Sequence, residues 1–216
     1  MSMKQRIVFI GDSITWWGKS EGDDIGTGYV RLVHDYLKIT YPERDMDMFN
    51  KGISGNRVDD LAERWEQDVV SLQPDFVSIS IGINDVWRQF DSPEMVQIYP
   101  DRFEEIYESL LTNLKGKTNA TIILMEPTVI NEDIQAEGNL KLGPYVKIVD
   151  KLARKYHGIV VPTHQEFINY LKHGNRQPLT IDGVHMNSMG NMLMAKTWIK
   201  ATQHLFSQNR NGQSVG

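Results

Sequence analysis

The sequence predicts an α/β protein, a three-layer α/β/α sandwich around a five-stranded parallel sheet. Two observations carry this prediction. Five short apolar runs recur along the chain, and the first is rich in β-branched residues, as strands buried on both faces are. Amphipathic stretches with helical spacing alternate with these runs, which is typical of parallel strands joined by helices.

The predicted strands differ in how clearly the sequence marks them. The first lies at residues 7–10 and ends on the sequence Gly-Asp-Ser. The second, at residues 46–49, is weakly marked, whereas a strong apolar run at residues 76–81 predicts the third. Residues 121–125 and 158–161 form the fourth and fifth.

The predicted helices follow from apolar residues spaced three or four positions apart. These stripes run over residues 29–37, 61–72, 103–114, 145–156 and 192–205. Trp65 and Trp198 lie on two of the stripes and are predicted to belong to the core. The chain shows no linker and no repeat, so we expect one domain over residues 1–207 and a flexible polar tail over residues 208–216.

Composition narrows the classes of function. The formal net charge of −5 disfavours nucleic acids and anionic membranes as partners. The chain has no cysteine, which excludes disulfides and thiolate metal sites. Its first apolar stretch is too short for a signal peptide, and no run approaches the roughly 18 residues of a membrane span. We therefore expect a cytoplasmic protein.

Polar segments that follow the strands are the candidate site, because ligands of open α/β sheets bind beyond the carboxyl ends of the strands. Ser13 follows the first strand, Gly55 lies in the segment after the second, and Asn84 follows the third. Asp182 and His185 lie three residues apart before the last helix. Taken singly, each of these residues is more often part of a turn or a helix cap.

Together these residue types supply what acyl transfer needs. A serine is a weak nucleophile until a neighbouring base takes its proton, and a histidine oriented by a carboxylate is suited to that task. The tetrahedral intermediate then needs rigid donors for its oxygen. The N–H groups of Ser13 and Gly55 and the side-chain amide of Asn84 are candidates for these donors.

The four sequence blocks GDSIT, NKGISGN, GIND and DGVH together resemble those of the SGNH hydrolases, also called GDSL esterases and lipases. The resemblance implies Ser13 as nucleophile, His185 as base, Asp182 as triad acid, and Gly55 and Asn84 as oxyanion donors with Ser13. It also implies the flavodoxin-like strand order 2-1-3-4-5. The blocks span residues 11–185, so the resemblance covers nearly the whole chain.

The stretches GYVRLV, GISGN and IGINDVWRQF resemble most a subgroup that includes intracellular acetylxylan and carbohydrate esterases. Two positions depart from the pattern. Met186 follows the histidine where the family commonly has proline, and Trp16-Trp17 stands where smaller or polar residues are expected. The second departure bears on the substrate more than on the reaction.

Six residues within or beside the blocks are candidates for substrate binding. They are Asp12, Trp16, Trp17, Trp87, Arg57 and Arg88. A tryptophan is most often a core residue, but these three follow catalytic blocks and are expected to crowd the rim of the site. Each arginine either binds substrate or pairs with a carboxylate of the protein.

The expected activity is hydrolysis of short acyl esters, above all O-acetyl esters of carbohydrates, through an acyl-enzyme and without a metal or organic cofactor. Two alternatives stay open: a lysophospholipase or acyl-CoA thioesterase with the same triad, and a non-catalytic carbohydrate-binding module. The expected partner is a small-molecule or oligosaccharide ester. The aromatic rim, which no lid-like insertion covers, favours a homo-oligomer.

Overall fold

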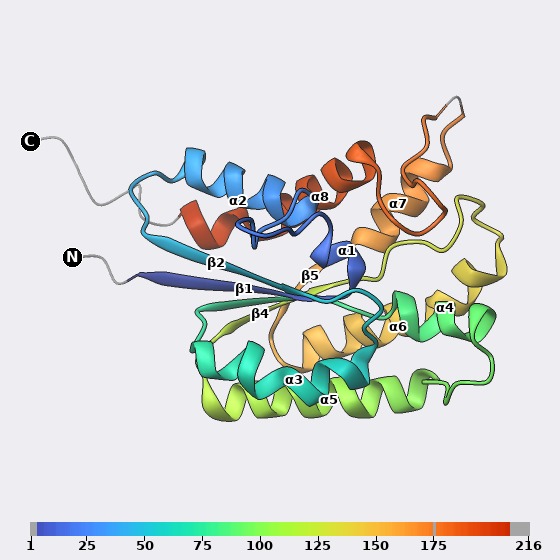
Figure 1. The fold of residues 1–216 in the computed structure, drawn as a ribbon, viewed down its shortest axis with the longest axis horizontal. Helices are drawn as coiled ribbons and strands as arrows, with labels where there is room; N and C mark the ends of the chain where they lie inside the picture. The colour runs from blue at the N-terminus through green and yellow to red at the C-terminus, as the bar shows by residue number, and fades with distance from the viewer. Residues whose placement is uncertain (1–3, 175, 208–216) are drawn as a thin grey trace, which may run out of the picture.

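A parallel sheet of five strands forms the middle layer of the computed structural model, which describes residues 4–174 and 176–207 (Figure 1). Its strands are β1 (Gln5–Gly11), β2 (Met46–Gly52), β3 (Phe76–Ser80), β4 (Thr121–Met125) and β5 (Ile159–Val161). They lie in the order β2-β1-β3-β4-β5, and every neighbouring pair is parallel. The predicted fold class and strand order are therefore confirmed. The predicted tail over residues 208–216 lies outside the described residues, and the division into one domain and a tail stays a prediction.

Helices cover both faces of the sheet (Figure 1). One face carries α2 (Tyr29–Thr40), α7 (Thr163–Leu171) and α8 (Ser188–Ser207). The other carries α3 (Val58–Asp68), α5 (Pro100–Lys117) and α6 (Glu137–Lys155), with a 3₁₀ turn at Val70–Leu72 after α3. Two shorter helices, α1 (Ser13–Trp16) and α4 (Ile83–Asp91), lie at the end of the sheet where the strands finish.

The core confirms the assignment of the first strand and of two tryptophans. The apolar residues 7–10 of β1 have no exposed surface, because β2 and β3 pair with β1 on its two edges and helices cover its faces. Trp198 is fully buried with its ring 5.5 Å from that of Phe9, and its Nε1 donates a hydrogen bond to Ser78 Oγ at 3.0 Å. Trp65 is only 3% exposed.

Strand β2 is longer than the sequence predicts, because a buried amide continues it. The side chain of Asn50 donates hydrogen bonds to the carbonyl groups of Thr15 and Ile25 and accepts one from the N–H of Gly52. This polar residue thus belongs to the strand and not to the loop, since its side chain satisfies backbone groups of two neighbouring segments. The short helices α1, α4 and α7 were not predicted either, because four to nine residues give little periodicity to detect.

Two negative findings concern the part of the chain that the structure describes. None of its helices is both long and apolar enough to cross a membrane. Within the same residues, no group of three or more His, Cys, Asp or Glu side chains is arranged to hold a metal ion.

Candidate active site

A chain of two hydrogen bonds joins three of the predicted site residues. Ser13 Oγ lies 2.9 Å from His185 Nε2, and His185 Nδ1 lies 2.6 Å from Asp182 Oδ2. When Nδ1–H donates to the carboxylate, Nε2 is left to accept the hydroxyl proton of Ser13. The structure therefore brings together residues that are 172 positions apart in sequence, in the order that nucleophilic acyl transfer requires.

The turn between β1 and α1 fixes Ser13. A Cβ on Gly11 would lie 2.3 Å from the carbonyl oxygen of Ser80, so only glycine allows β1 to approach β3 so closely at this point. Asp12 then caps α1, because its side chain accepts a hydrogen bond from the N–H of Ile14 at 2.9 Å. Ser13 is the first residue of that helix, where backbone N–H groups have no partner within the helix.

Asp12, the residue before Ser13, is buried in the turn that it caps. It is 2% exposed, and its carboxyl group faces the backbone of its own turn. Burial raises its pKa to about 7, against the opposing influence of the Ile14 N–H and of His185. Asp12 therefore acts as the cap of α1, and its carboxyl group is shielded from solvent.

Both oxygens of Asp182 are used in holding His185. Oδ2 accepts from the ring, and Oδ1 accepts from the N–H groups of Val184 at 3.0 Å and His185 at 2.7 Å. Burial alone would raise the pKa of Asp182, but the hydrogen bonds from His185 and Val184 outweigh it and lower the pKa below its ordinary value. The carboxylate thus stays ionised and fixes both the imidazole and the loop that carries it.

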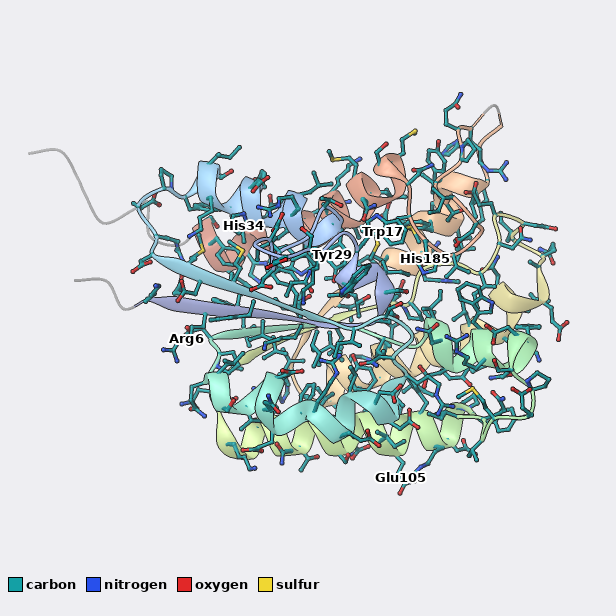
Figure 2. The ribbon with its side chains drawn as sticks, in the orientation of Figure 1. Arg6, Trp17, Tyr29, His34, Glu105 and His185 are labelled. Atoms are coloured by element: carbon teal, nitrogen blue, oxygen red, sulfur yellow. The ribbon has the colours of Figure 1, made fainter. Side chains whose placement is uncertain are left out.

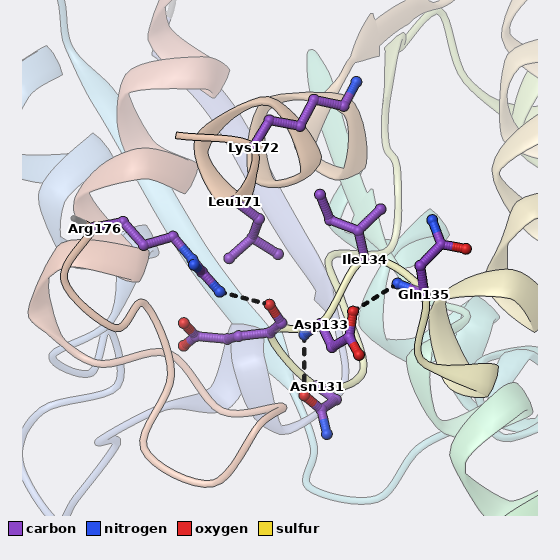
Figure 3. Close-up of a pocket in the computed structure, with 8 residues that line it drawn as sticks. Asn131, Asp133, Ile134, Gln135, Leu171, Lys172 and Arg176 are labelled. Atoms are coloured by element: carbon purple, nitrogen blue, oxygen red, sulfur yellow. Dashed lines mark hydrogen bonds between the residues drawn. The ribbon is translucent and has the colours of Figure 1, made fainter. Parts of the chain in front are cut away.

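The segment after β4 forms hydrogen bonds with the loop that carries His185 and with the residues just before it. The N–H of Asn131 donates to the carbonyl of Gly183 at 2.7 Å. Glu132 Oε1 accepts three hydrogen bonds of 2.6–2.8 Å, from the N–H groups of Leu179 and Thr180 and from the Thr180 hydroxyl. A pocket of about 720 Å³ lies beside this segment, and Figure 3 draws the residues that line it. Arg176 donates to the carbonyl of Glu132 there at 2.9 Å. The sequence does not predict these hydrogen bonds to Glu132, because an isolated glutamate in a loop gives no signal of its distant partners.

The two remaining oxyanion candidates lie on segments that are bonded to each other. Gly55 has a φ of +82°, which favours glycine. The segment that follows it is tied to α4 by two hydrogen bonds. Asn84 Nδ2 donates to the carbonyl of Asn56 at 3.0 Å, and the N–H of Val58 donates to Asp85 Oδ1 at 3.1 Å. The relative position of Gly55 and Asn84 is therefore set by bonds between side chain and backbone.

Asp85, the residue after Asn84 in α4, is a buried acid. It has no exposed surface, and burial raises its pKa to about 8. Among the described residues, none forms a hydrogen bond with its Oδ2. We infer that Asp85 is mainly protonated at neutral pH, since a buried carboxylate with one oxygen that lacks a partner is strongly unfavourable.

Two of the three predicted tryptophans contact the imidazole of His185. Trp17 stacks on it, with ring centroids 5.3 Å apart and planes inclined by 29°. Figure 2 labels the two residues, which lie close together. Trp87 lies 5.8 Å from the His185 ring at 59°. Trp16, by contrast, is 36% exposed. The sequence placed these residues near the rim, but it gave no sign that two of them flank the histidine.

The two predicted arginines differ in their surroundings. Arg57 donates to the carbonyl of Val96 at 2.7 Å and to Asp59 Oδ2 at 3.0 Å, so its guanidinium is engaged within the protein. Arg88 pairs with Asp91 at 2.5 Å, and its Nη2 lies 3.5 Å from where a Cβ on Gly55 would be. Of the two arginines, Arg88 is therefore the one whose guanidinium lies next to Gly55, the glycine of the candidate oxyanion hole.

Several known proteins are similar to this chain in sequence and in structure. The family model of the GDSL-like lipases and acylhydrolases matches residues 9–193. An acetylxylan esterase of Geobacillus stearothermophilus is 39% identical over 204 residues, which cover 91% of this chain and 93% of the relative. The crystal structure of an acetylxylan esterase from the same organism is similar with a TM-score of 0.84 and 38% identity, over 93% of this chain and 96% of the other. An α/β hydrolase enzyme from the metagenome of Lake Arreo, Spain, is similar with a TM-score of 0.86 and 34% identity, with the same coverage.

Variants of the Geobacillus esterase have also been solved. Three of them are described as catalytic mutants, in which a serine, an aspartate or a histidine is replaced by alanine. In that enzyme the aspartate and the histidine lie three positions apart. Asp182 and His185 have the same spacing in this chain.

Proposed function

This chain belongs to the GDSL-like lipase/acylhydrolase family and is a carboxylic ester hydrolase, and from that premise we propose that it removes acetyl groups from carbohydrates with Ser13, His185 and Asp182. The observation that carries the proposal is the continuous hydrogen-bonded path from Ser13 Oγ through the imidazole to Asp182. The acetyl group and the carbohydrate are supported by the similarity to an acetylxylan esterase.

Acylation follows from the positions of these atoms. His185 Nε2 takes the proton of the Ser13 hydroxyl as Oγ attacks the ester carbonyl carbon. Asp182, ionised because of its hydrogen bonds, stabilises the imidazolium that forms. His185 Nε2 then gives the proton to the oxygen of the leaving alcohol, the C–O bond breaks, and the acyl group stays on Ser13.

Deacylation repeats the sequence with water. His185 Nε2 takes a proton from the water as its oxygen attacks the acyl carbon, and it returns that proton to Ser13 Oγ as the acid leaves. In both halves, negative charge develops on the carbonyl oxygen. We assign its stabilisation to the N–H groups of Ser13 and Gly55 and to Asn84 Nδ2, three donors held by short, bonded segments. The reaction as written needs no metal or organic cofactor.

A substrate panel tests the proposal. The purified protein is assayed with acetylated xylo-oligosaccharides, with p-nitrophenyl acetate, butyrate and octanoate, and with acetyl-CoA. We expect the highest kcat/KM on acetylated sugars and a fall from acetate to octanoate. Faster turnover of octanoate would favour the lysophospholipase alternative, and faster turnover of acetyl-CoA the thioesterase alternative. Binding of xylo-oligosaccharides without hydrolysis of any ester would favour the non-catalytic module.

A further inference from the structure

We propose that an apolar pocket beside Trp87 binds the sugar ring of the leaving alcohol; this inference rests on the proposed function. The pocket has a volume of about 200 Å³. Its lining residues come from α4, from the segment after β4 and from the start of α6, and they are Trp87, Phe90, Ile130, Asn131, Ala136 and Gly138. Segments distant in sequence thus form one hollow next to the candidate catalytic histidine.

Two contacts place this pocket on the His185 side of the site. Trp87, which forms part of the pocket wall, contacts the His185 ring with centroids 5.8 Å apart. Asn131, another lining residue, donates its N–H to the carbonyl of Gly183, two residues before the histidine. The wall of the pocket is therefore continuous with the loop that carries the general acid.

The reaction mechanism indicates which part of the ester lies on the His185 side of the site. His185 Nε2 must reach the oxygen of the leaving alcohol to protonate it, whereas the carbonyl oxygen points toward Gly55 and Asn84. The alcohol, and not the acyl group, is therefore the part of the substrate nearest to the histidine. The pocket beside Trp87 is where the rest of that alcohol extends.

The chemistry of the lining suits a pyranose ring. Such a ring presents C–H groups on its faces and hydroxyl groups on its edge. Trp87, Phe90, Ile130 and Ala136 give the pocket an almost wholly apolar surface, which matches the C–H face of such a ring.

Two further features keep the pocket open and in shape. A Cβ on Gly138 would lie 2.5 Å from Cγ2 of Ile130, so glycine lets α6 begin close against the pocket wall. Lys141 Nζ lies 4.7 Å from the centre of the Phe90 ring, which fixes one face of that ring by a cation–π contact. The neighbouring larger pocket is lined mainly by charged and polar residues, including Glu132, Lys172 and Arg176 (Figure 3), and suits a neutral sugar face less well.

The test is a change of alcohol selectivity at constant acyl group. Ala136→Trp fills the pocket, and Leu140→Trp places the same indole side chain within α6, four residues further on, at a residue that is 61% exposed and does not line the pocket. Each variant and the unmodified enzyme are assayed with xylose tetraacetate and with ethyl acetate. We expect Ala136→Trp to lower the ratio of the two kcat/KM values at least about tenfold, mainly through KM for the sugar ester, and Leu140→Trp to keep the ratio.

Several results would overturn the proposal. One is a ratio that stays within about twofold of the unmodified enzyme's in Ala136→Trp. Another is a change of about tenfold or more, in Ala136→Trp, in the ratio of kcat/KM for ethyl acetate to that for ethyl butyrate. These two esters differ only in the acyl group, so such a change would make the pocket an acyl site. If Ala136→Trp does not fold, Phe90→Ala, which truncates a residue that is 40% exposed, is expected to lower the same ratio by weakening sugar binding. An unmodified enzyme that hydrolyses no acetyl ester would instead reject the proposed function.

Discussion

The indole of Trp17 stacks on the imidazole of His185, with ring centroids 5.3 Å apart. Trp17 is four residues after Ser13, so one short segment of chain provides both the nucleophile and an aromatic wall for its base. An imidazole that becomes cationic during the reaction is stabilised by such a wall through a cation–π contact. The two tryptophans that depart from the family pattern therefore have different surroundings. Trp17 lies against the histidine of the candidate site, whereas Trp16 is more exposed.

Replacing Trp17 by leucine should slow catalysis without preventing folding. The stack holds the His185 ring in its orientation, and an aromatic pair of this kind contributes about 0.5–1.5 kcal/mol. We expect Trp17→Leu to lower kcat by up to about tenfold, whereas Trp17→Phe, which keeps an aromatic face, retains most of it. Steady-state kinetics on ethyl acetate with melting curves check this. Equal losses in both variants would argue against a role for stacking.

Removing the amide of Asn84 should affect the transition state. The side chain donates to the carbonyl of Asn56 and is assigned a second donation to the oxyanion. We expect Asn84→Ala to lower kcat by about 10²–10³ with a small change in KM. Single-turnover acylation with p-nitrophenyl acetate measures this step directly. A variant that acylates at the normal rate would remove Asn84 from the oxyanion hole.

Asp85 should make the stability of the protein decline as pH rises. Its folded-state pKa is about 8, whereas the ordinary value is 3.8, so between these values the folded state holds a proton that the unfolded state has lost. The free energy of unfolding therefore decreases from about pH 4 to about pH 8 because of this group and is flat above.

Asp85→Asn keeps the acceptor for the Val58 N–H and does not titrate. The Tm of this variant relative to the unmodified protein should rise across the same pH range, and the contribution of Asp12 cancels in the comparison. A difference in Tm that does not depend on pH would show that Asp85 is ionised in the folded protein.

Glu132 should act on catalysis through the loop that it holds. Glu132→Ala removes the acceptor of three hydrogen bonds from Leu179 and Thr180, and we expect a loss of about 1–3 kcal/mol in stability. Loosening of the segment before Asp182 should also lower kcat more than it raises KM. Glu132→Gln keeps a carbonyl oxygen and should recover most of both. Urea unfolding and kinetics on p-nitrophenyl acetate measure the two effects, and a stability loss without any change in kcat would limit Glu132 to a structural role.

The sequence alone predicts the location of those site residues that come directly after a clear strand. Ser13 and Asn84 come directly after strongly apolar strands, so the parallel sheet was enough to place them at one edge. The chain segment of His185 lies far from any clear strand end, and its proximity to Ser13 was expected from the residue types and the family resemblance. The family pattern thus supplied what periodicity could not.

Other contacts could not be read from the chain. The contacts of Trp17 and Trp87 with His185, and the hydrogen bonds that residues 179–180 donate to Glu132, depend on how loops pack, and loops carry no periodic signal. The extension of β2 through Asn50 depends on one buried amide that satisfies backbone groups of two other segments. Where tertiary hydrogen bonds override local preference, only the folded arrangement reveals the role of a residue.

Covalent labelling of Ser13 tests the central claim most directly. The protein is treated with a fluorophosphonate, digested and analysed by mass spectrometry, with Ser13→Ala and with Ser20→Ala, a serine outside the hydrogen-bonded triad, as comparisons. We predict one adduct, on Ser13, with loss of p-nitrophenyl acetate hydrolysis in proportion to labelling, no adduct in Ser13→Ala and normal labelling in Ser20→Ala. An adduct on another residue, or undiminished hydrolysis by Ser13→Ala, would contradict the assignment of Ser13 as the nucleophile.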